Sequence, residues 1–248
     1  MSDTDAPRNR RRFIASIAGG TAALAAAGFT ASDLLAQGGG GVPNSPPPQG
    51  GWDMSWLNRV EKAKHRHVFD APDVADGMAL NHTNLVLRGY AEVYQTTDAD
   101  AAAVVVYRHL GLPAVLNDDM WSRLKLGERT KVKDRATNEF ALRNPFLRLK
   151  PADPAAPSVP SAPEGGADAP SPLQTGLDTL IARGVIVLCC NLALMQHAGR
   201  LARAESMPVE DARASVINAL VPGVIRMPSG VFAVARAQEA GCHFIRST

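Results

Sequence analysis

Two adjacent cysteines, Cys189 and Cys190, have the residue type and position that offer the clearest chemistry in this sequence. They end the apolar run 185–188 and precede Asn191, a residue type that often caps the first turn of a helix. A helix N-terminus has free N–H groups and a positive dipole end, which favour a thiolate over a thiol. The pattern predicts a nucleophilic or sulfur-carrying cysteine. The alternative is that both cysteines are small buried apolar residues.

Other polar residues could contribute to a site at the same end of the fold. His109 follows the apolar run 101–107, and Asp118 lies a short distance further along the chain. We place both near a site, and the alternative for each is a surface or capping role. Ser229 and Gly230 could bind an anion through the N–H groups of a following helix, or could form an ordinary turn and cap.

A metal site is a further interpretation of the histidines. His65 and His67 would lie on one face of an extended segment, and with His82 or His109 they could ligate a metal ion. Solvated or hydrogen-bonded histidines are commoner, so we predict no metal site. The sequence also lacks a glycine-rich nucleotide loop and a Gly-x-Ser-x-Gly nucleophile elbow, and we predict no cofactor.

The elements that must position these residues alternate along the chain. The predicted strands are 67–70, 101–107, 185–189, 224–227 and 242–245. The predicted helices are 74–94, 113–126, 173–183, 192–204, 209–220 and 231–240. Helices that alternate with short apolar strands indicate an α/β fold with a mainly parallel sheet of about five strands. Two of these strands precede the Pro- and Ala-rich residues 151–172 and three follow them. This division favours one domain with an insertion over two separate domains.

The N-terminal region is interpreted as a targeting signal followed by a flexible linker. Residues 9–14, NRRRFI, and the mild apolar stretch after them resemble a twin-arginine export signal, which we assign to residues 1–36. Residues 37–64 are assigned to a flexible linker and lead-in, because the Gly- and Pro-rich part cannot bury an apolar face. We expect a periplasmic or otherwise exported protein that meets the twin-arginine translocation machinery. An uncleaved signal that anchors the chain in the membrane is the alternative.

Residues 151–172 form a second low-complexity stretch of Pro, Ala, Ser and Gly, predicted to be a disordered insertion in a domain that spans residues 65–248. The whole chain of 248 residues carries 26 basic and 24 acidic residues, a net charge of +2. Beyond the first dozen residues these charges are interspersed. This distribution argues against a nucleic-acid binder that uses a broad basic face.

Disulfide pairing is disfavoured by the predicted strands. Cys189 would lie at the carboxyl end of one parallel strand and Cys242 at the amino end of another, ~15 Å apart along the strand direction. A disulfide needs α-carbons within about 7 Å. A bond between the adjacent Cys189 and Cys190 would strain the peptide link. We expect free thiols, or a cysteine oxidised by its own chemistry.

Three segments together resemble the DsrE/DsrF-like family. They are CCNLAL at residues 189–194, VPGVIRMPSGV at 221–231 and AQEAGCHFIR at 237–246. They match a strand that ends in Cys-x-Asn, a Pro-Ser-Gly-Val segment that opens a helix, and a Gln-x-x-Gly-aromatic-x-Ile-Arg terminus. The resemblance covers about 60 residues, and residues 65–126 are compatible with the first half of that fold.

The resemblance implies a three-layer α/β/α domain that assembles as a homo-oligomer, in which a cysteine carries a persulfide between partner proteins. Cys189 takes the family's cysteine position and Asn191 its asparagine position, whereas Cys190 stands where many relatives have glycine. Which sulfur acts therefore stays open. The expected function is a thiol-based sulfur carrier or sulfur-compound binder with a donor or acceptor protein as partner. The alternative is a non-catalytic binding or assembly module, and the sequence does not decide whether the chain is an enzyme.

Overall fold

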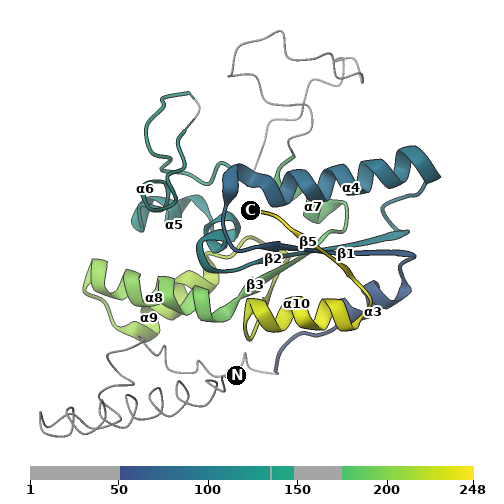
Figure 1. Ribbon diagram of the computed structural model, residues 1–248. Helices are drawn as coiled ribbons and strands as arrows, with labels where there is room; N and C mark the ends of the chain where they lie inside the picture. Colours follow the sequence, from purple (N-terminus) through teal and green to yellow (C-terminus); the bar gives the residue numbers. More distant parts are fainter. Residues whose placement is uncertain (1–50, 135, 148–174) are drawn as a thin grey trace, which may run out of the picture. The chain divides into compact units, whose positions relative to one another are not determined.

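A five-stranded, all-parallel sheet forms the centre of the computed structural model, which describes residues 51–134, 136–147 and 175–248. Its strands are β1 (His65–Ala71), β2 (Ala101–Tyr107), β3 (Ile186–Cys190), β4 (Val224–Met227) and β5 (His243–Arg246). They lie side by side in the order β4-β3-β2-β1-β5 (Figure 1). The predicted α/β fold with a mainly parallel sheet of about five strands is confirmed.

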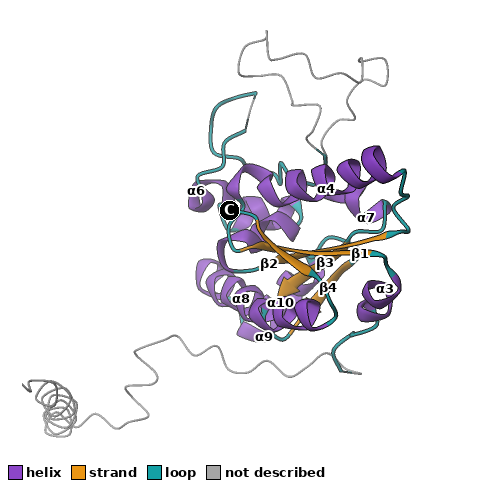
Figure 2. Cartoon of the chain, turned by 45° about the vertical axis from the view of Figure 1, so that its right-hand side comes forward, coloured by secondary structure: helices purple, strands orange, loops and turns teal. Residues whose placement is uncertain are grey.

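Helices cover both faces of this sheet. They are α3 (Trp56–Lys62), α4 (Met78–Tyr94), α5 (Asp118–Arg123), α6 (Leu126–Thr130), α7 (Leu177–Ala182), α8 (Asn191–Glu205), α9 (Val209–Asn218) and α10 (Gly230–Glu239), with short 3-10 helices η1 (Ala75–Gly77) and η2 (His109–Val115). Figures 1 and 2 show α4 and α7 on one face and α3 and α10 on the other. The described residues thus form the three α/β/α layers. In these residue ranges, no helix is both long and apolar enough to cross a membrane.

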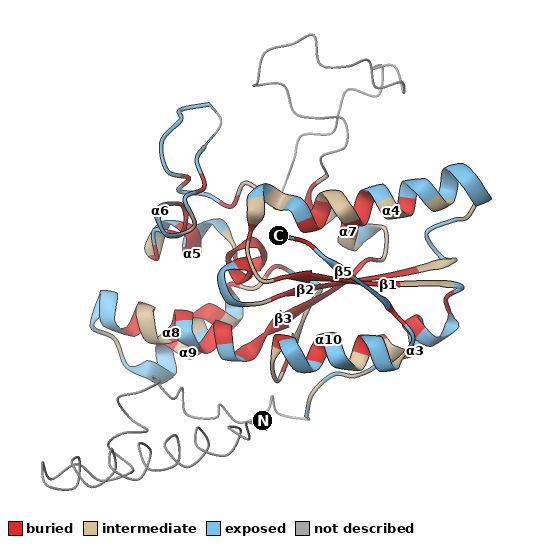
Figure 3. Ribbon diagram, in the orientation of Figure 1, coloured by how far each residue is buried: buried red, intermediate tan, exposed pale blue. Residues whose placement is uncertain are grey.

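The core follows the alternation of side chains along the strands. Val104, Val106, Ile186 and Leu188 are buried in one cluster with Trp56 of α3 and with residues of α10. Because successive strand residues point to opposite faces, the residues between them face the α4 layer. Both sets are almost fully buried, and Figure 3 shows the buried residues concentrated along the central strands. This two-sided burial accounts for the continuous apolar runs in the sequence.

The predicted helix 113–126 is wrong. The chain there forms η2 and α5 and then starts α6, separated by extended backbone at Leu116 and by a left-handed Lys125 with φ of 48°. The side chain of Asn117 caps α5 by accepting a hydrogen bond from the Met120 N–H, at 3.0 Å. A local capping residue therefore starts a new helix inside a segment whose apolar spacing indicated one continuous helix.

Several other boundaries differ from the sequence prediction. Residues 56–62, assigned to linker and lead-in, form α3, whose Trp56 and Val60 are buried in the core. The predicted helix 173–183 is α7, which begins at Leu177; residues 173–174 lie outside the described residues. The signal segment 1–36 and the insertion 151–172 also lie outside them.

Gly111 in η2 offers a test of the packing above the sheet. A β-carbon there would overlap the carbonyl oxygen of Ala71 and lie 3.2 Å from the backbone nitrogen of Asp73. Since backbone atoms cannot move aside cheaply, we expect Gly111→Ala to lower the free energy of unfolding by about 3 kcal/mol. Gly89→Ala is the control, because a β-carbon on Gly89 of α4 meets nothing within 4 Å.

In urea denaturation, Gly89→Ala should raise the free energy of unfolding by about 0.5–1 kcal/mol, the usual gain from removing an interior helix glycine. Equal effects of the two substitutions would contradict the close packing of η2 on the end of β1.

Candidate functional site

The carboxyl ends of β1, β2 and β3 place three chemically active side chains on one face of the sheet. Asp70, Arg108 and Cys190 continue the alternating positions that face α10, since Val68, Val106 and Leu188 precede them by two residues. The register pairs Tyr107 with Cys189, so that Arg108 follows β2 at the level of Cys190 on β3. Open α/β sheets commonly bind ligands at this edge.

Arg108 is held by a two-point ion pair with Asp70. Its Nε and Nη2 donate to the two carboxylate oxygens of Asp70, each at 2.7 Å, and Asp70 is only 6% exposed. The hydrogen bond to Asp70 raises the pKa of Arg108, partial burial opposes this, and the charges of Asp70 and Cys190 add to the increase. Arg108 is therefore a fixed cation whose charge interacts with Cys190.

Cys190 occupies the junction between β3 and α8. Its Sγ accepts a hydrogen bond from the Ala193 N–H at 3.5 Å, and its residue is 5% exposed. The capping side chain of α8 is thus Cys190 and not Asn191, which corrects the sequence interpretation: the strand begins and ends one residue later than predicted, and the helix begins at Asn191. Asn191 is buried, and among the described residues its Oδ1 finds no hydrogen-bond partner.

The turn from β4 into α10 packs against Arg108. Ser229 Oγ accepts from the Phe232 N–H at 3.1 Å and caps α10. A β-carbon on Gly230 would lie 2.6 Å from the β-carbon of Arg108, so the backbone of Gly230 packs directly against the arginine side chain. Cys190, Arg108, Asp70 and Gly230 form the group that we call the carboxyl-edge site.

Cys189 differs from its neighbour in environment. It lies on the opposite face of β3 and is fully buried, and burial raises the pKa of its thiol to about 12, with an added rise from Cys190 and an opposing effect of Arg226. Cys242 precedes β5 at the amino end of the sheet, and burial raises the pKa of its thiol to about 11. All three cysteines are free. Only Cys190 therefore belongs to the carboxyl-edge site.

Two other predicted site residues, His109 and Asp118, lie outside the carboxyl-edge site. His109 directly follows Arg108, is exposed and has a left-handed backbone with φ of 48°. Asp118 begins α5, and its Oδ1 accepts from the Asn144 N–H at 2.9 Å, which ties down the segment around residue 144. No interaction within the described ranges joins either residue to Cys190.

The histidines at the start of β1 pack against α4. His65 stacks on Tyr90 with ring centroids 4.0 Å apart, and His67 Nε2 lies 3.1 Å from the Tyr90 hydroxyl. Burial lowers the pKa of His67, and His243 and His65 lower it further. No three His, Cys, Asp or Glu side chains among the described residues form a group that could hold a metal ion.

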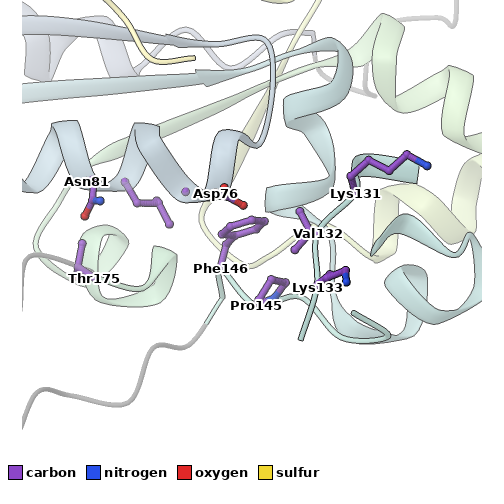
Figure 4. Close-up of a pocket in the computed structure, with 10 residues that line it drawn as sticks. Asp76, Asn81, Lys131, Val132, Lys133, Pro145, Phe146 and Thr175 are labelled. Atoms are coloured by element: carbon purple, nitrogen blue, oxygen red, sulfur yellow. The ribbon is translucent and has the colours of Figure 1, made fainter. Parts of the chain in front are cut away.

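A cavity of about 420 Å³ opens beside the start of α4. It is lined by Asp76, Gly77, Leu80, Asn81, Lys131, Val132, Lys133, Pro145, Phe146 and Thr175. Figure 4 shows Phe146 between Asn81 and Thr175 at one end and the two lysines at the other. None of the residues that the sequence singled out lines it, because its wall comes from segments without a recognisable motif.

Asp70 and Arg108 are candidate site residues that sequence reasoning missed. The available signal was their position: each lies at the end of an apolar strand, two residues after a buried residue that faces the same side of the sheet.

No protein-family model matches this chain, and comparisons with curated proteins and with solved structures find no similar protein.

Proposed function

We propose that this protein is a thiol-based sulfur carrier whose sulfur-carrying atom is Cys190 Sγ. The observation that carries the proposal is the position of this sulfur at the N-terminus of α8, where it accepts the Ala193 N–H and experiences the charge of Arg108. A helix N-terminus and a nearby cation both stabilise a thiolate, and the thiolate is the reactive form of cysteine.

The proposed step transfers one sulfur atom. The Cys190 thiolate attacks the terminal sulfur of a persulfide or polysulfide donor, a new S–S bond forms on Cys190, and the bond to the donor breaks. The donor leaves as a thiolate and keeps the electron pair of the broken bond, so no external oxidant or reductant is needed. The resulting persulfide anion on Cys190 would be stabilised by Arg108.

The surroundings of the two cysteines favour Cys190 over Cys189. The raised pKa of Cys189 keeps its thiol protonated at neutral pH, and its side chain is fully buried. Thiolate fraction and access both decide the rate of sulfur exchange. Cys189 is then a packing residue, although it takes the cysteine position of the DsrE/DsrF-like pattern, and its neighbour performs the chemistry.

The setting that we propose follows from the N-terminal sequence and from the family pattern. The motif NRRRFI at residues 9–14 supports export through the twin-arginine route to the periplasm. The DsrE/DsrF-like segments support a homo-oligomer that receives sulfur from, or delivers it to, a partner protein. A binding or assembly module with inert cysteines is the second candidate, and the burial of all three cysteines favours it.

Intact mass separates the two candidates. The mature protein is isolated from the exported fraction without reductant, incubated with polysulfide, and compared with Cys189→Ser and Cys190→Ser. We expect an added sulfur of ~32 Da, lost on reduction, in the wild type and in Cys189→Ser, and none in Cys190→Ser. Serine is a good N-cap, so Cys190→Ser preserves the start of α8.

An adduct that persists in Cys190→Ser would move the carrier role to Cys189 or Cys242. The absence of any adduct would favour the binding module. Rapid labelling of native Cys190 by a thiol reagent, with the other two cysteines labelled only after denaturation, would give independent support for the carrier.

A further inference from the structure

A second cavity, of about 480 Å³, is walled almost entirely by cations. It lies between the α5 and α6 segment and the C-terminal half of α8, and we call it the basic cavity. Its lining residues are Arg123, Leu124, Lys125, Arg129, Arg200, Arg203 and Ala204. Five of these seven side chains are basic and none is acidic, which is unusual for a protein whose net charge is only +2.

One of these five cations is already neutralised. Arg123 donates to both carboxylate oxygens of Glu205, at 2.8 and 2.6 Å, and also to Asp119 at 3.2 Å. These hydrogen bonds raise the pKa of Arg123 and lower that of Glu205. Arg123 is thus a fixed wall of the cavity.

The other four cations lack such partners. Within the described part of the chain, no acidic side chain forms an ion pair with Lys125, Arg129, Arg200 or Arg203. Arg200 and Arg203 are three residues apart on α8, a spacing that places like charges side by side on one face of a helix, and Lys125 directly precedes α6, which carries Arg129. Such pairs cost stability, so packing does not explain why they gather here.

The charges act on one another and on a buried histidine. Partial burial lowers the pKa of Arg200, and Arg129 and Arg203 lower it further. His197, one turn before Arg200 on α8, is 4% exposed, and its Nδ1 has no hydrogen-bond partner among the described residues. Burial, Arg200 and Arg129 lower the pKa of His197 to about 3. Positive potential therefore extends from the cavity into the protein beneath it.

We propose that the basic cavity binds a small polyanion with two or more phosphate or sulfate groups. Guanidinium groups match these oxyanions by two parallel hydrogen bonds, and three uncompensated arginines converge here from two helices. A volume near 480 Å³ suits a small molecule, and the patch is local, unlike the broad basic face of a nucleic-acid binder. No residue of the carboxyl-edge site lines this cavity, so the site is independent of the proposed sulfur chemistry.

Isothermal titration calorimetry tests the proposal on the full-length chain. The probes are tripolyphosphate and sucrose octasulfate, in two arms that distinguish a phosphorylated from a sulfated ligand, with sodium chloride of equal ionic strength as the reference. We expect binding in at least one arm, and at least tenfold weaker binding after Arg200→Gln or Arg129→Gln. Arg213→Gln on α9 is the matched control, because Arg213 pairs with Glu210 and does not line the cavity; its affinity should stay within twofold of wild type.

Thermal unfolding without ligand separates a binding role from a structural one. Removal of an uncompensated charge should leave the melting temperature of Arg200→Gln equal to or above that of wild type, while the stabilisation by tripolyphosphate is lost. The proposal is overturned if neither anion binds more tightly than chloride does, or if Arg200→Gln and Arg213→Gln weaken binding equally.

Discussion

Replacing Arg108 with methionine is expected to lower the free energy of unfolding by about 3 kcal/mol, since a carboxylate left alone in a buried site is strongly destabilising. The Arg108 side chain is 21% exposed and that of Asp70 is 8% exposed, and two hydrogen bonds join them. Methionine keeps much of the side-chain volume and removes the charge. Chemical denaturation at neutral pH measures the loss.

Two comparisons make this result specific. Arg236→Met removes an exposed partner of Glu239, whose side chain is 60% exposed, and should cost less than about 1 kcal/mol. The double substitution Asp70→Asn with Arg108→Met removes both charges and should recover part of the loss. A double variant no more stable than Arg108→Met would mean that the cost comes from packing against Gly230 and not from the unpaired carboxylate.

The largest pH effect is expected from His197. Its folded pKa of about 3 lies below the ordinary value of 6.5, so between these two values the unfolded chain binds a proton that the folded chain does not. The free energy of unfolding therefore rises with pH across this window and falls on acidification. From pH 7 to pH 4 the contribution of His197 should fall by about 3 kcal/mol.

His197→Gln removes this contribution. The difference in unfolding free energy between wild type and variant, measured by denaturation from pH 7 to pH 4, should therefore change by that amount in favour of the variant. Acidic residues titrate in both proteins and cancel in the difference. His109→Gln, the same change at an exposed histidine, tests whether the loss of any histidine suffices. An unchanged difference between wild type and His197→Gln would show that burial, together with Arg200 and Arg129, does not hold His197 neutral.

The sheet could be predicted from the sequence because its central strands, β2 and β3, are apolar on both faces. β2 has the predicted bounds, and its central valines are fully buried. The break at Lys125 could not be predicted, since its left-handed backbone is unusual for lysine. Long-range contacts decide such positions, and local propensity does not reveal them.

The candidate site was predictable only in part. The cysteine pair and the following helix were visible as a pattern, whereas the link from Arg108 to Asp70 depends on which strands are neighbours and on their register. The basic cavity was hidden for a similar reason. Arg129 and Arg200 lie far apart in the sequence, and only the fold brings their charges together.

The pairing of β1 with β5 also bears on how the chain folds. β1 pairs on one side with β2, which follows soon after it, and on the other side with β5, roughly 180 residues later. Contacts between such distant segments form slowly because a long loop must close first. Until β5 docks, one edge of β1 has unpaired backbone groups beside Val68 and Phe69, a template for pairing with another chain. A chain in which β5 has not yet docked would therefore expose a pairing edge that the native sheet covers.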